Sequence, residues 1–139
     1  VELLKQRARP YLFSNALAPA VCGSSLEAIR IARGGEGDAL RTQLTANAAR
    51  YRAAMTEAGF DLLTGEHPII PVMLGDAKLA QTLAARLLEL GVYVIGFSFP
   101  VVPRGAARIR TQMSAAHKFD HIDQTVAAFT TAGRELGVI

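Results

Sequence analysis

The sequence has a single cysteine, no long apolar run and little net charge. Each of these absences excludes some classes of protein function. Cys22 alone cannot form an intrachain disulfide, which suits a reducing cytoplasm, and we expect it to be buried filler on a helix. No stretch reaches the roughly 18 uncharged apolar residues of a membrane span. The net charge of +3 comes from scattered basic residues, without the basic stripe and interleaved aromatics of a nucleic-acid-binding surface. Membrane and nucleic-acid partners are therefore not expected.

Common catalytic patterns are missing as well. The three histidines, His67, His117 and His121, lack metal-ligand spacing to cysteine or carboxylate, so we expect surface or capping roles and no metal site. There is no Gly-x-Ser-x-Gly elbow and no Ser-His-Asp order. The glycine-rich residues 34–37 follow a predicted helix rather than a strand, which indicates a helix-ending turn and not a phosphate loop.

What is present indicates one compact domain. Half of the 139 residues are apolar, enough to build a core. Hydrophobic spacing, prolines and glycines predict helices over residues 1–7, 18–33, 38–58, 77–90 and 119–136. Asp38 is expected to cap the third of these at its start, and Asp76 and Gly91 to cap the fourth at its two ends. Extended segments or strands are expected over residues 9–15, 60–63, 69–74, 92–99 and 107–113. This order predicts an α+β arrangement, with helices packed on one face of a small, mostly antiparallel sheet. The chain opens as if inside a helix, which indicates a piece of a longer protein.

Two short stretches carry possible binding chemistry. In the predicted strand at 107–113, alternation places Arg108 and Arg110 on one face and Ile109 on the other. For Arg108 we favour a solvated edge-strand residue or an ion pair to a helix. For Arg110 the neighbouring proline-rich loop at residues 99–103 suggests a cleft wall, and a carboxylate-binding role there and a purely structural role are about equally supported. Ser14 sits at a predicted strand end before a helix; an ordinary helix cap is favoured there over a phosphate contact.

Longer motifs connect the chain to a known family. The stretches RPYLFSNALAP (residues 9–19), PIIPVMLGDAKLAQ (68–81), GVYVIGFSFPVVPRGAARIRTQMSAAH (91–117) and GRELGVI (133–139) resemble the α-oxoamine synthases. These are pyridoxal-phosphate enzymes of fold type I, and the motifs resemble most the glycine C-acetyltransferase branch of threonine degradation. The resemblance implies an α/β enzyme of which this chain is the C-terminal third. Residues 1–17 would end the coenzyme-binding large domain and supply a dimer-interface segment, and residues 18–139 would form the small domain.

The resemblance also implies an activity and site residues. The cofactor would be pyridoxal 5'-phosphate, and the reaction would interconvert glycine and acetyl-CoA with 2-amino-3-ketobutyrate and CoA in a cytoplasmic homodimer with shared active sites. Arg110 matches the arginine that holds the substrate's α-carboxylate. Ser14 matches a residue that reaches the coenzyme phosphate of the partner subunit. The segment with the Schiff-base lysine is missing, so no catalytic residue is expected in this chain, which should be inactive alone.

Two other readings remain open. The chain could belong to another member of the family, such as an 8-amino-7-oxononanoate synthase, which uses a different amino acid and acyl donor. It could also be a free-standing, non-catalytic module that binds small carboxylates. Only the reading as part of an enzyme predicts apolar surface exposed within the first roughly 20 residues, where the rest of an enzyme would pack.

Overall fold

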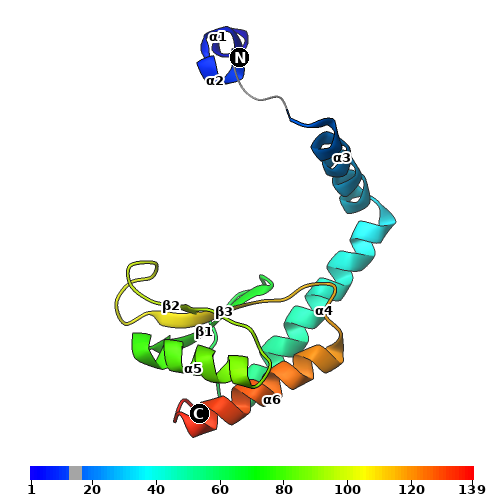
Figure 1. Ribbon diagram of the computed structural model, residues 1–139. Helices are drawn as coiled ribbons and strands as arrows, with labels where there is room; N and C mark the ends of the chain where they lie inside the picture. Colours follow the sequence, from blue (N-terminus) through cyan, green and yellow to red (C-terminus); the bar gives the residue numbers. More distant parts are fainter. Residues whose placement is uncertain (13–16) are drawn as a thin grey trace. The chain divides into compact units, whose positions relative to one another are not determined.

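The computed structural model describes residues 1–12 and 17–139, which fall into two compact units (Figure 1). The first unit comprises Val1–Asp38 and the second comprises Ala39–Ile139. Each unit is described below by itself. The candidate site lies wholly in the second unit.

The described part of the first unit is helical. It contains α1 (Glu2–Arg7), α2 (Arg9–Leu12) and α3 (Pro19–Arg33), so the predicted helices at both ends are confirmed. The prediction of an extended segment from residue 9 is wrong for residues 9–12. Pro10 lies in the first turn of α2, where its missing N–H costs no helical hydrogen bond, and the Tyr11 N–H donates to the Ala8 carbonyl at 2.9 Å. Residues 13–15 lie outside the described part.

The apolar side chains of the first unit are largely uncovered. The helix α3 buries none of its residues, and Leu3 and Leu4 of α1 are each 72% exposed. The prediction that Cys22 is buried is therefore wrong, because its helix has no packed core around it and the thiol is exposed. The expected apolar surface near the start of the chain is confirmed.

The long helix α4 (Gly35–Glu57) starts earlier than predicted. The break after α3 shrinks to Gly34, whose extended backbone caps α3. Asp38, expected to cap the helix from outside, instead lies within its first turn, where a carboxylate interacts favourably with the helix dipole. Residues from Ala39 onward belong to the second unit.

A three-stranded antiparallel sheet forms the centre of the second unit. It contains β1 (Ile69–Gly75), β2 (Gly96–Phe97) and β3 (Ala107–Gln112) in the order β1-β3-β2. The predicted arrangement of helices over a small antiparallel sheet is confirmed. The arginine-bearing strand β3 is central, however, so the reading of Arg108 on an edge strand is wrong.

Two predicted strands are shorter than expected. The segment at 60–63 keeps one isolated bridge, Leu62 to Val72, because Phe60 turns into the core and packs edge-on to Phe129. The segment at 92–99 pairs only at Gly96–Phe97. Its first residue, Val92, follows α5 (Ala77–Glu89) and is still bonded to it, because the Val92 N–H donates to the Leu87 carbonyl at 2.8 Å. Gly91, with φ +85°, makes this helix ending possible.

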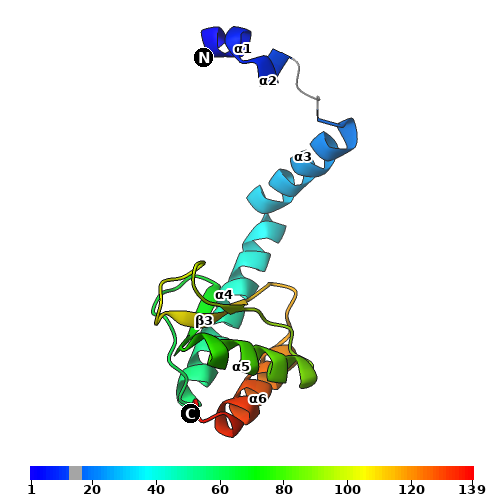
Figure 2. The same cartoon turned by 60° about the vertical axis from the view of Figure 1, so that its left-hand side comes forward.

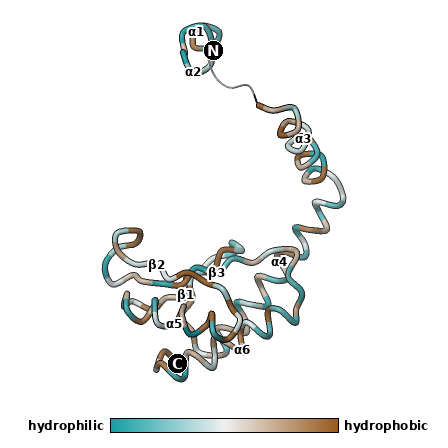
Figure 3. The backbone as a smooth tube through the Cα atoms, viewed as in Figure 1, coloured by the Kyte–Doolittle hydropathy of each residue, from teal (hydrophilic) through white to brown (hydrophobic). Residues whose placement is uncertain are grey.

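The helices cover one face of the sheet. Both Figure 1 and Figure 2 show α5 and α6 (Phe119–Glu135) on the same side. The hydrophobic run of β1 lies in the middle of this unit (Figure 3). Buried side chains of α4, α5, α6, β1 and β3 meet there, including Tyr51, Leu83, Phe129, Val72 and Ile109. The opposite face of β3 carries Arg108, Arg110 and Gln112, as alternation predicted, and the helices leave it open.

No helix among the described residues is long and apolar enough to cross a membrane.

Candidate functional site

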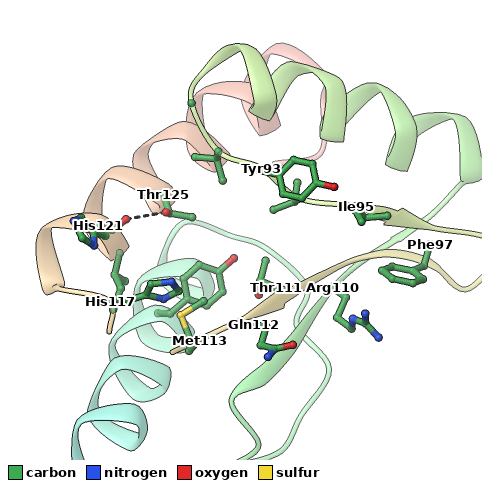
Figure 4. A pocket seen from close by; sticks show the side chains of 15 residues that line it. Tyr93, Ile95, Phe97, Arg110, Thr111, Gln112, Met113, His117, His121 and Thr125 are labelled. Carbon is green, nitrogen blue, oxygen red and sulfur yellow. Dashed lines mark hydrogen bonds between the residues drawn. The ribbon is translucent and has the colours of Figure 1, made fainter. Parts of the chain in front are cut away.

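A pocket of about 390 Å³ opens where β2 and β3 stop pairing (Figure 4). The two strands pair at Gly96–Ile109 and Phe97–Arg108. The same register would place residues 92–95 opposite residues 110–113, but these two segments do not pair with each other, and both line the pocket. The side chains of Ile122 and Thr125 on α6 add a further wall. The pocket is therefore a wedge in the sheet, between the segment that leaves the end of α5 and the second half of β3.

Arg110 lines this pocket from β3 and carries its most distinctive chemistry. Its side chain is exposed, and its guanidinium carbon lies over the Phe97 ring, 4.5 Å from the ring centroid. Among the described residues, the Arg110 guanidinium forms neither an ion pair nor a hydrogen bond. The planar fork of donors is therefore available to a carboxylate or phosphate, which it can grip with two parallel hydrogen bonds.

Other arginines of the second unit are already engaged. Arg86 donates to both carboxylate oxygens of Glu135, at 2.7 and 3.0 Å, and this holds the pKa of Glu135 below its ordinary value. Arg50 binds Asp123 in the same two-pronged way and lowers the pKa of that carboxyl. Arg108 makes no ion pair among the described residues and does not line the pocket, so the predicted pair with a helix is not found. Arg110 differs from Arg50 and Arg86 in having no carboxylate partner among the described residues, and it lines this pocket, so its position suits an external anion.

The wall facing Arg110 differs from the predicted one. The proline-rich loop at 99–103 does not line this pocket. Instead Figure 4 shows Tyr93 and Ile95 across from Arg110 and Gln112, with His117, His121 and Thr125 further along. The prediction of a cleft beside Arg110 is correct, but the segment at 92–95 and α6 form it.

His117 and His121 have the expected capping roles and also face the pocket. The Ser114 N–H donates to Nδ1 of His117, and the Lys118 N–H donates to Nδ1 of His121, each at 3.3 Å. Thr125 donates its hydroxyl to the His121 carbonyl at 2.7 Å. The pocket positions of these residues were not foreseen, although their four-residue spacing places His121 and Thr125 on one helix face.

A buried amide supports the turn that follows β3. Asn47 of α4 is fully buried and donates through Nδ2 to the carbonyls of Ser114 and His117, both at 2.8 Å. Its Oδ1 accepts from Gln43 at 2.8 Å. These bonds fix the end of the arginine-bearing strand relative to α4. Sequence reasoning missed Asn47, because a lone asparagine in a helix gives no local signal of its partners.

Tyr51 contributes its ring to the base of the same pocket. Burial raises the pKa of its hydroxyl above the ordinary range, and the nearby Thr111 hydroxyl offsets this only in part. Thr111 already donates to the Ile70 carbonyl at 2.7 Å. The Tyr51 oxygen is left without a well-formed hydrogen bond among the described residues. It is a neutral, buried phenol at neutral pH.

The remaining predicted residue, Ser14, lies outside the described residues. The chain's lysines are Lys5, Lys78 and Lys118, and none lines the pocket. In the described part, no three His, Cys, Asp or Glu side chains cluster as metal ligands would. The pocket therefore fits a carboxylate-bearing ligand at Arg110, but it does not provide the lysine that would hold pyridoxal phosphate covalently.

Comparison with known proteins identifies the family. The model of aminotransferase class I and II matches residues 1–129. The chain belongs to the class I and II aminotransferase family.

The predicted resemblance within this aminotransferase family is confirmed. The chain is 54% identical, over its whole length, to 2-amino-3-ketobutyrate coenzyme A ligase of Escherichia coli K12, and covers 34% of that protein. It is 46% identical over 138 residues to an 8-amino-7-oxononanoate synthase of Coprothermobacter proteolyticus, covering 99% of the chain and 35% of that protein. A structure of serine palmitoyltransferase K265A from S. paucimobilis with bound PLP–myriocin is 31% identical, with a TM-score of 0.89 over 99% of this chain and 35% of that one. The chain spans about a third of the length of these relatives.

Proposed function

We propose that this aminotransferase-family chain is the C-terminal part of a pyridoxal-phosphate-dependent acyltransferase. The complete enzyme interconverts glycine and acetyl-CoA with 2-amino-3-ketobutyrate and CoA. Support comes from the 54% identity to the E. coli ligase along the whole chain and from the unengaged guanidinium of Arg110 at a pocket. The second observation carries the proposal, because it supplies the group that an amino-acid substrate needs.

Arg110 binds the α-carboxylate of the amino acid in this proposal. A two-pronged grip fixes the direction of the carboxylate, and with it the direction of the bonds at the α-carbon. The coenzyme, when bound, supplies the electron sink that stabilises negative charge at that carbon. The lysine that attaches the coenzyme is provided by other parts of the complete enzyme, so the 139-residue chain alone is inactive.

The remaining assignments follow the resemblance. Ser14 donates a hydrogen bond to the coenzyme phosphate of the partner subunit in a homodimer with shared active sites. Residues 1–17 belong to the end of the large domain and to the interface, and residues 18–139 form the small domain. The apolar side chains exposed on α1 and α3 support a covering surface outside this chain. The single cysteine, Cys22, supports a cytoplasmic location.

The test is Arg110→Lys in the complete enzyme, or in a chimera where residues 1–139 replace the matching third of the E. coli relative. A lysine keeps the charge but cannot form two parallel bonds. Losing one charge-assisted hydrogen bond, about 1.5 kcal/mol or more, lowers kcat/KM for glycine at least about tenfold. The absorbance of the bound coenzyme is the same in Arg110→Lys as in the wild type. Arg108→Lys is the matched control, because Arg108 lies on the same strand face but outside the pocket. Equal glycine kinetics in the two variants would remove Arg110 from the site.

The 8-amino-7-oxononanoate synthase activity is the second candidate, favoured by the 46% identity to such an enzyme. The complete enzyme is assayed with glycine and alanine, each against acetyl-CoA and pimeloyl donors. We expect the highest kcat/KM for glycine with acetyl-CoA. A preference for alanine with a pimeloyl donor would replace the proposed reaction with the second one.

A non-catalytic carboxylate-binding module makes a different prediction. It would bind an amino acid without any further polypeptide. Titration calorimetry of the 139-residue chain with glycine distinguishes the two ideas. We expect no measurable heat at millimolar glycine, and binding in the micromolar range would favour the module.

A further inference from the structure

Arg110 can grip a carboxylate well only if its guanidinium is already oriented. A free arginine side chain loses rotamer entropy when it is fixed, and a contact that already restrains it reduces that loss on binding. The Arg110 side chain is exposed and has no hydrogen-bond or ion-pair partner among the described residues. Its contact with the Phe97 ring, at 4.5 Å from the centroid, is therefore what restrains it in the described structure.

The strand register explains why Phe97 reaches Arg110. Phe97 pairs directly with Arg108, so the side chains of Phe97, Arg108 and Arg110 lie on the same face of the sheet. Arg110 is the diagonal neighbour of Phe97, a separation that an aromatic ring and a long side chain can bridge. Figure 4 shows the Phe97 ring beside the Arg110 guanidinium, at the far end of the pocket-lining side chains from His117 and His121.

Phe97 is itself rigidly supported. Gly96, the residue before it, lies so close to α5 that an added Cβ would be 2.9 Å from the Ala80 carbonyl oxygen. Gln81 of α5 also donates to the Gly96 carbonyl at 3.4 Å. The short strand β2 is thus seated directly on the helix backbone, and the ring projects from a fixed position.

We propose that Phe97 is a positioning residue for the amino-acid substrate. Its ring holds the Arg110 cation over the aromatic face by a cation–π interaction. The guanidinium donors lie in the guanidinium plane, so their hydrogen bonds to a carboxylate do not compete with the ring. This inference rests on the proposed function, since it assumes that Arg110 binds the α-carboxylate. It adds a role for Phe97, which lines the pocket beside Arg110 and acts through its guanidinium.

The experiment compares Phe97→Leu with Phe97→Tyr in the complete holoenzyme, at saturating acetyl-CoA. An exposed cation–π contact is worth about 0.5–1 kcal/mol, so Phe97→Leu raises the KM for glycine about two- to fivefold. Coenzyme affinity does not change. Phe97→Tyr keeps an aromatic face and restores the wild-type KM. Phe99→Leu is the matched control, because it removes a similar stack, on Arg104 at 4.9 Å, outside the pocket.

A double-mutant cycle separates this inference from the proposed function. If Phe97 acts through Arg110, Phe97→Leu has no further effect on glycine KM in an Arg110→Gln background, where no cation remains for the ring to hold. An additive effect would overturn the inference while leaving Arg110 in its role. A wild-type KM in Phe97→Leu, alongside a large loss in Arg110→Lys, would do the same. Unchanged kinetics in Arg110→Lys itself would refute the proposed function first.

Fluorinated phenylalanines at position 97 provide a variant with nearly native shape. Successive fluorines weaken the negative potential of the ring face, on which the cation–π attraction depends. We expect glycine KM to rise stepwise with fluorination while the melting temperature stays constant. A KM that does not follow the fluorine number would overturn the inference even if Phe97→Leu fails to fold.

Discussion

Gly96 is the point where the sheet is seated on α5, and Gly96→Ala tests that packing. The new Cβ would lie 2.9 Å from the Ala80 carbonyl oxygen, 3.1 Å from its carbonyl carbon and 3.4 Å from its Cβ. The nearest atoms belong to helix backbone, which cannot rotate away as a side-chain tip can. The strand must therefore move away from α5 by about half an ångström to reach ordinary contact distance.

The magnitude follows from two opposing effects. Overpacking a tight site costs about 1–3 kcal/mol. Alanine also restricts the unfolded chain, which offsets about 0.4–1 kcal/mol of that cost. We expect a net loss of about 1–2 kcal/mol in the free energy of unfolding. For a domain near 100 residues this lowers the melting temperature by about 5–15 °C.

Urea and thermal unfolding, followed by circular dichroism, measure this change. The transition midpoint should fall while the urea dependence of the free energy stays constant. Gly23→Ala is the matched control, because nothing lies within 4 Å of its added Cβ and α3 tolerates alanine well. The packing argument fails if Gly96→Ala is as stable as the wild type, or if the control loses as much. In the complete enzyme Gly96→Ala should also raise glycine KM, since Phe97 moves with the strand.

Two further predictions concern stability. Tyr51→Phe removes a buried hydroxyl that lacks a well-formed hydrogen bond, so we expect the free energy of unfolding to rise by about 1 kcal/mol in urea titration, and a clear loss would show that this hydroxyl is satisfied. Glu135→Gln breaks the two-pronged bond from Arg86 between α5 and α6. Because Arg86 depresses the folded-state pKa of Glu135 below 4.5, its stabilisation is present at neutral pH and is lost as pH falls through that depressed pKa. Differential scanning calorimetry should therefore show a lower melting temperature for Glu135→Gln at pH 7 and a difference that shrinks as the pH falls below 4.5, and a pH-independent difference would contradict this reasoning.

Local patterns were enough for most of the second unit. The helix α5 follows from leucine spacing between the Asp76 cap and Gly91, and both caps form as expected. Strict alternation placed Ile109 and Arg110 on opposite faces of β3, because successive side chains of a strand point to opposite sides, and burial shows that the Ile109 face is the inward one. The same reasoning failed over residues 9–12, where a proline that disfavours helix before it is also well suited to a first helical turn.

The sequence by itself determined most of the elements, the faces of β3 and the family, because these depend on short-range spacing and on motifs that can be read along the chain. Only the tertiary structure showed where the pocket lies and which residues hold its walls in place. The wedge exists because β2 stops pairing after two residues, and Arg110 is restrained by a ring on the neighbouring strand. Asn47 holds carbonyls 67 and 70 positions away. Such contacts join residues that are distant along the chain, and no local pattern records which distant partner a side chain will meet.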